Sequence, residues 1–249
     1  MAGRSQRRRI QQARLMKIHK QKGLDLMKKI LAVILFAVMA MSLTACSSDD
    51  SDVPKASPDT SRSHSEKAKT LVVYFSMPDD DIKDSTVTVD GETLGNTQYM
   101  AYVIQENTNG NIFRIIPQTD YPTDHDELID LAKEEKNDNA RPKIESTVEN
   151  FDNYDTVFIG YPNWWGDMPM ILYTFFDTYD FSGKTIIPFN THGGSGFSQT
   201  IDTIKGLEPD ADVKDGLSVS RDDIEDAQSE IVEWLKGLGF EKNSSQTTE

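Results

Sequence analysis

The chain has 249 residues, a formal net charge of -15 and a single cysteine. One cysteine excludes an internal disulfide framework and any metal or iron–sulfur site that needs several cysteines. Because the first 45 residues are basic, the remaining residues are more acidic than the chain as a whole. An acidic surface favours solubility and disfavours nucleic acid as a partner.

The first segments in chain order are typical of an exported bacterial protein. Residues 1–26 form a basic extension, which is either a cytoplasmic segment or the product of a start codon assigned too far upstream. Residues 27–45 then combine Lys28 and Lys29, an apolar run and a small-residue end, which predicts a signal peptide. The apolar run is shorter than the roughly 20 residues that a membrane-spanning helix needs.

The end of this segment, Leu43-Thr44-Ala45-Cys46, resembles the bacterial lipobox. The resemblance implies that Cys46 carries a lipid, which would anchor an extracytoplasmic protein to a bacterial membrane. The alternative is a buried or chance cysteine in an ordinary signal peptide. Residues 46–69 and 241–249 are polar, and we expect a disordered tether and a disordered tail there.

Residues 70–240 have the alternating pattern of one α/β domain. Short apolar runs alternate with segments of helical period, which predicts a parallel sheet with helices on both faces. Because Pro188 cannot donate a ladder hydrogen bond, we place it at the carboxyl end of its strand. The five expected strands are residues 71–75, 112–116, 156–161, 185–189 and 213–219.

Apolar residues at helical spacing predict five helices, one after each strand. The last has the clearest stripe, with Ser220 and Asp223 as a capping box and Gly237 or Gly239 as its end. The helices are expected around Met100 and Ile104, Leu128 and Ala132, Leu172 and Phe176, Ile201 and Ile204, and Ile224 to Leu238.

The loops whose residues suit ligand binding follow the first, third and fourth strands. They lie at the edge where open α/β sheets bind ligands. Ser76 is followed by a polar insertion over 77–94 and then by Gly95-Asn96-Thr97. A glycine turn with hydroxyls at a helix start suits a phosphate, although it is also an ordinary cap.

The other two loops suit a planar ligand. Trp164 and Trp165 lie in a loop bounded by proline and glycine, where an aromatic contact with a ring contributes about 1 kcal/mol beyond burial. The alternative is that both tryptophans cap the hydrophobic core. In the next loop, glycines at 193, 194 and 196 let backbone approach a ligand closely.

Taken together, residues 71–76, 95–97, 154–166 and 183–196 resemble flavodoxin-like proteins, and most closely a bacterial branch often found as lipoproteins. The resemblance spans about residues 69–238. It implies a three-layer flavodoxin-like sandwich, with a five-stranded parallel sheet in the order 2-1-3-4-5, and it implies FMN as the cofactor.

Carried over by position, the resemblance assigns three groups of residues to FMN, with no catalytic side chain and no metal. The phosphate group is Ser76, Asn96, Thr97 and Gln98; one side of the ring pocket is Pro162, Asn163, Trp164, Trp165 and Gly166; the other side is Thr191, His192, Gly193, Gly194, Ser195 and Gly196. The departure from the family pattern is the 77–94 insertion, whose residues 86–92 could form a hairpin over the site.

The resemblance implies electron transfer with an unknown redox partner. The acidic surface and a stacked tryptophan would lower the reduction potential, which suits a carrier. The alternatives are an FMN-dependent NAD(P)H quinone or nitro reductase, although the sequence has no second dinucleotide fingerprint, and a cofactor-free surface binding module.

Two unrelated classes have little support. His192-Gly193-Gly194 resembles the oxyanion loop of esterases, but the sequence has no G-x-S-x-G nucleophile motif. A metal site is disfavoured because the four histidines are scattered along the chain, at His19, His64, His125 and His192.

Overall fold

The computed structural model describes residues 69–78, 85–89 and 91–240. The predicted basic extension, the signal peptide, Cys46, nearly all of the tether and the tail lie outside these residues. No helix in the described part of the chain is long and apolar enough to cross a bilayer.

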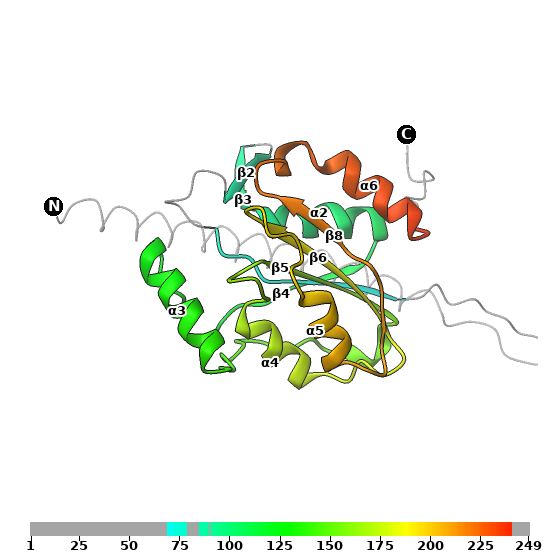
Figure 1. The fold of residues 1–249 in the computed structure, drawn as a ribbon. Coiled ribbons are helices and arrows are strands. Elements are labelled where there is room, and N and C mark those ends of the chain that lie inside the picture. Colours follow the sequence, from blue (N-terminus) through cyan, green and yellow to red (C-terminus); the bar gives the residue numbers. More distant parts are fainter. Residues whose placement is uncertain (1–68, 79–84, 90, 241–249) are drawn as a thin grey trace, which may run out of the picture. The chain divides into compact units, whose positions relative to one another are not determined.

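A parallel sheet forms the centre of the described domain (Figure 1). Its order is β4-β1-β5-β6, with β7 and β8 both pairing with the outer side of β6. This confirms the expected order 2-1-3-4-5, with the fifth position split into two short strands. The strands are β1 (Thr70–Tyr74), β4 (Asn111–Arg114), β5 (Thr156–Pro162), β6 (Thr185–His192), β7 (Asp212–Val213) and β8 (Leu217–Ser220).

Helices cover both faces of the sheet, which confirms the three-layer sandwich. In Figure 1, α2 (Asn96–Thr108) and α6 (Gln228–Gly237) lie on one side of the sheet. On the other side lie α3 (His125–Asn137), α4 (Met170–Thr178) and α5 (Thr200–Leu207). Two short 3-10 helices complete the described elements, η1 (Phe151–Asn153) and η2 (Ile224–Asp226).

Successive side chains of the strands enter different cores. Val72 packs with Met100 of α2 and Ile231 of α6, whereas Val73 belongs to the cluster that contains Phe175 of α4 and Ile204 of α5. This alternation is what the period of a strand requires when both faces are covered. Burial of both faces explains why the strands are nearly continuous apolar runs in the sequence.

The insertion after β1 contains the expected hairpin. Strands β2 (Thr86–Val89) and β3 (Glu92–Gly95) pair antiparallel. Val87 is 4% exposed and packs in the core beneath α2, and the carbonyl of Ser85 accepts from Asn96 N at 3.1 Å. The hairpin is therefore attached to the domain at the start of α2.

The expected position of Pro188 is wrong, because it lies inside β6. Backbone N–H groups alternate sides along a strand. The carbonyl of Ile186 accepts from Lys214 N on the β7 side, so the nitrogen of Pro188, two residues later, faces the same side. The edge strand is interrupted there between β7 and β8, and the missing N–H therefore removes no ladder partner.

The last helix also differs from its expectation in detail. Its stripe is buried as predicted, with Ile224, Ile231 and Leu235 at 1%, 0% and 0% exposure, but the chain forms η2 and α6 instead of one helix. The capping box does not form, because Ser220 Oγ accepts from Asp222 N at 3.3 Å and the Asp223 side chain makes no cap hydrogen bond.

We expect the interrupted edge to depend on Gly216. A methyl group there would overlap the Pro188 carbonyl and the Phe197 ring, so Gly216→Ala should lower the free energy of unfolding by about 1–3 kcal/mol. In the matched control Gly206→Ala, the new methyl meets nothing within 4 Å, and helix propensity should leave the stability unchanged or raise it by up to about 1 kcal/mol. Urea unfolding measures both, and equal stabilities would contradict the packing described here.

Candidate functional site

A cavity of about 260 Å³ opens at the carboxyl ends of β1, β5, β6 and β8. This is the edge predicted from the sequence, at the position where the chain leaves neighbouring strands β1 and β5 toward opposite faces of the sheet. The cavity is lined by Ser76, Met77, Ser85, Asn96, Thr97, His125, Leu128, Ile129, Ala132, Pro162, Asn163, Trp164, Trp165, Thr191, His192, Gly193 and Arg221.

One end of the cavity is the start of α2. Ser76 is 4% exposed and lies so close to Gly95 that a Cβ atom at position 95 would overlap its Oγ. Ser76 therefore meets the helix start despite the 18-residue insertion between them. Thr97 is 1% exposed, and its Oγ1 lies 2.8 Å from Thr191 Oγ1 at the end of β6.

The first turn of α2 suits an anion. Its N-cap, Gly95, makes no side-chain cap hydrogen bond, and the turn contains no acidic residue. The amides of a first helical turn have no partner within the helix, and the helix dipole adds positive potential there. The Asn96 amide donates to the Ser85 carbonyl. Within the described residues, neither a side-chain cap nor a carboxylate of this turn competes with an anion at the amides that follow.

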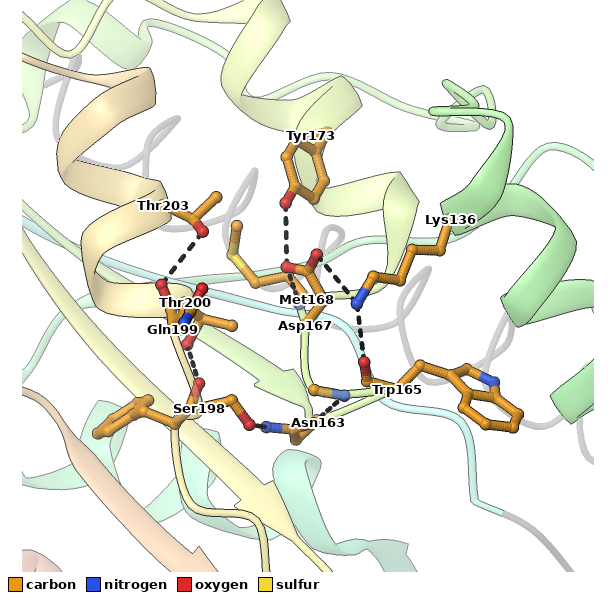
Figure 2. Close-up of polar contacts among 12 residues, drawn as sticks. Lys136, Asn163, Trp165, Asp167, Met168, Tyr173, Ser198, Gln199, Thr200 and Thr203 are labelled. Carbon is orange, nitrogen blue, oxygen red and sulfur yellow. Dashed lines mark hydrogen bonds and ion pairs between the residues drawn. The ribbon is translucent and has the colours of Figure 1, made fainter.

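The loop after β5 makes a tight two-residue turn. Trp164 and Asp167 exchange two backbone hydrogen bonds, of 2.9 and 3.0 Å, and between them Trp165 and Gly166 have φ values of 54° and 74°. A left-handed conformation at a bulky side chain costs about 1–3 kcal/mol and needs support from its surroundings. Lys136 gives that support, donating to the Trp165 carbonyl at 2.7 Å (Figure 2).

The side chain of Asn163 connects this turn to the loop after β6. Its Oδ1 accepts from Gly166 N at 3.0 Å, and its Nδ2 donates to the Gly196 carbonyl at 2.8 Å and to Ser198 Oγ at 3.1 Å. Figure 2 shows Asn163 between Ser198 and the turn. Asn190, which is fully buried, donates to the same Gly196 carbonyl at 3.0 Å. Two amides thus fix the position of one carbonyl.

The two tryptophans have different surroundings. Trp164 is partly buried and meets Phe75 and Tyr121 edge to face, with ring centroids 5.5 and 5.6 Å apart. It therefore both caps the core and lines the cavity. Trp165 is 50% exposed, and its ring packs against α3. Its Nε1 donates to the Ile129 carbonyl at 3.0 Å, and Lys133 Nζ lies 5.1 Å from the ring centroid.

The phenol behind Trp164 stays protonated. Burial, and then the charge of the neighbouring Glu135 carboxylate, raise the pKa of Tyr121 well above its ordinary value. The hydroxyl of Tyr121 accordingly donates to Glu135 Oε2 at 2.9 Å. This hydrogen bond holds the ring that supports the cavity wall.

Among the described residues that line the cavity there is no carboxylate, although the chain is strongly acidic. Among the lining residues, Arg221 has the one permanent charge, and His125 and His192 are the other ionisable side chains. Arg221 N donates to the His192 carbonyl at 2.8 Å, and the guanidinium lies against Gly193. The positive charge of Arg221 favours a ligand that carries negative charge at this part of the wall.

Ten of the fifteen residues assigned from the resemblance line the cavity, and five do not. The side chain of Gln98 points along α2 and donates to Tyr102 at 2.9 Å. Gly194 N donates to His192 Nδ1 at 2.9 Å, which bends the loop after β6. The five residues outside the wall are Gln98, Gly166, Gly194, Ser195 and Gly196.

Sequence reasoning missed seven lining residues. Leu128, Ile129 and Ala132 lie on α3, where the apolar spacing was used only to predict a helix. Arg221 follows β8, and its place at the carboxyl end of an expected strand was a usable signal. The others are Met77, Ser85 and His125.

Comparison with known proteins gives a consistent set of relatives. The flavodoxin family model matches residues 88–237. A proposed flavoprotein from Bacteroides eggerthii DSM 20697 is 30% identical, with 70% of this chain and 99% of that chain covered and a TM-score of 0.56. A proposed flavoprotein from Bacteroides uniformis ATCC 8492 is 28% identical, with 68% and 98% covered and a TM-score of 0.54. No curated protein sequence matches the chain.

We expect Asn163 to contribute strongly to stability. Asn163→Ala removes three hydrogen bonds between two loops, which should lower the free energy of unfolding by about 2 kcal/mol. The control is Asn153→Ala, at an exposed position in η1, which should change it by less than about 0.5 kcal/mol. Urea unfolding decides, and a loss at Asn163 no larger than at Asn153 would contradict the linking role.

Proposed function

This chain belongs to the flavodoxin family, and on that premise we propose that its cavity binds FMN. The observation that carries the proposal is the start of α2, which has no side-chain cap and no acidic residue in its first turn and opens into the cavity. A phosphate is the ligand group that such a helix start favours.

At the phosphate end, we assign Ser76, Asn96 and Thr97. All three are buried and line the cavity beside the first turn of α2. The hydroxyls of Ser76 and Thr97 can each donate one hydrogen bond, and hydrogen bonds to a charged group are the stronger kind. Gln98 would contribute through its backbone amide, because its side chain is engaged with Tyr102.

At the ring end, we assign the turn that contains Trp164 and Trp165 and the loop of His192 and Gly193. These two loops face the same cavity, and Asn163 N donates to the Thr191 carbonyl at 2.8 Å where they meet. Trp164 is held by Phe75 and Tyr121, so it offers a ring whose position does not have to be ordered on binding.

Bound FMN supplies electron transfer, while the protein supplies binding and orientation. We therefore propose that the protein takes part in electron transfer. The side chains assigned to the ring would hold it between the two loops, and Leu128 and Ala132 of α3 would exclude water from the cavity. No lining residue has to act as a nucleophile for this function.

We also propose that the protein is lipid-anchored through Cys46 at the outer face of a bacterial membrane. The support is the sequence of the signal segment and of Leu43-Thr44-Ala45-Cys46. The polar stretch from Ser47 to Lys69 would separate the lipid from the flavin domain. A redox partner would then meet the protein outside the cytoplasm.

The FMN proposal predicts saturable quenching of flavin fluorescence by the full chain. Thr97→Ala should raise the dissociation constant for FMN about tenfold, because one hydrogen bond to the phosphate is lost, and should leave riboflavin binding nearly unchanged. Trp164→Ala should weaken the binding of both flavins.

Two side chains outside the cavity wall give matched controls for this titration. Thr203→Ala removes a hydroxyl of α5 that donates to the Gln199 carbonyl. Trp234→Ala removes an α6 ring that packs against the core shared by α2 and α6. Neither change should alter FMN affinity in folded protein. If the unaltered chain does not quench FMN at micromolar concentrations, the proposal is wrong.

The anchor proposal predicts that Cys46→Ser abolishes labelling by an alkyne fatty acid in a bacterial host. The variant should also be lost from the membrane fraction, because the proposal assigns the lipid to Cys46 alone. Ser47→Ala serves as the control and should keep both properties. Undiminished labelling of the Cys46→Ser variant would contradict lipidation at this position.

A further inference from the structure

The position of Arg221 points to a role in redox tuning. Resting on the proposed FMN site, we propose that the Arg221 guanidinium raises the reduction potential of the flavin by stabilising the negative charge of the reduced ring. Adding two electrons and one proton to the oxidised ring leaves one additional negative charge on it. A fixed positive charge at the ring end of the cavity favours that form.

The geometry places Arg221 at the ring end. Its backbone N donates to the His192 carbonyl at 2.8 Å. The Cβ position of Gly193 lies 3.4–3.5 Å from the Cζ, Nε and Nη1 atoms of Arg221. Backbone and side chain thus both lie against the loop after β6, which forms the wall assigned to the ring, and the residue lines the cavity.

Within the described ranges of the chain, the charge of Arg221 is little compensated. A guanidinium keeps its proton at any pH at which the protein is folded. Its ion pair with Asp222 is 3.8 Å long, and the Asp222 side chain is 72% exposed, so water screens this contact. The lining residues that the structure describes include no carboxylate.

This local charge opposes the effect of the acidic surface. Charges spread over the surface are screened over about 8 Å at physiological ionic strength. Arg221, although its side chain is 43% exposed, lines the cavity and therefore acts over a shorter distance. The sequence alone favours a low reduction potential because the chain is acidic. With Arg221 at the ring, we expect a reduction potential higher than the acidic surface alone would give.

The test compares Arg221→Gln with Arg221→Lys in the full chain loaded with FMN. The reduction potential is measured by anaerobic titration with dithionite against a reference dye. Arg221→Gln should reduce the preference for reduced over oxidised flavin about tenfold, which corresponds to about 30 mV for a two-electron couple. Arg221→Lys should have a reduction potential close to that of the unaltered protein, because the positive charge remains.

The control for net charge is Lys214→Gln, which removes one positive charge beside Asp212 and outside the cavity wall. It should leave the potential unchanged. Dissociation constants of every variant for oxidised FMN and for riboflavin are measured in parallel. If Arg221→Gln does not fold, Arg221→Met provides a second neutral side chain at the same position.

Two results would overturn this inference alone. The first is an unchanged potential in a neutral variant that still binds FMN. The second is a loss of affinity for FMN but not for riboflavin, which would place Arg221 at the phosphate. Failure of the unaltered chain to bind FMN is a different result, because it overturns the proposed function and with it this inference.

Discussion

The parallel pairing of β1 with β5 is the constraint on which the site depends. It runs from Thr70↔Thr156 to Tyr74↔Gly160 and continues with Phe75 N donating to the Gly160 carbonyl at 2.9 Å. The chain then leaves β1 toward α2 on one face and β5 toward α4 on the other (Figure 1). This divergence opens the cavity and brings Ser76 to the same edge as the tryptophan loop.

Within that frame, the two loops at the ring end stabilise one another. The turn at Trp165 is strained, and its support comes from Lys136 on α3 and from Asn163. Asn163 in turn fixes Gly196 in the neighbouring loop. A wall that is held in this way is ordered before any ligand arrives, so little of the binding energy is lost to ordering it.

The sheet order and the loops of the site could be predicted from sequence because apolar runs and glycine turns are local patterns. Pro188 could not be placed, since its tolerance depends on an interruption in another strand. The glycines at 193, 194 and 196 look alike in sequence, but in the structure Gly193 lines the cavity, whereas the carbonyl of Gly196 accepts hydrogen bonds from Asn163 and Asn190. The contribution of α3 to the cavity wall could not be predicted either. An apolar helix face that lines a cavity and one that packs in a core have the same period in the sequence.

The most direct test of the account is the backbone and indole NMR spectrum of the full chain, with Cys46→Ser to prevent lipidation, during titration with FMN and with riboflavin. The account predicts saturable shifts at the amides of Asn96, Thr97 and Gln98 with FMN but only weakly with riboflavin, and shifts of the Trp164 and Trp165 indoles with both. Shifts confined to other parts of the domain, or no shifts at millimolar flavin, would contradict the claim that this cavity holds FMN with its phosphate at the start of α2.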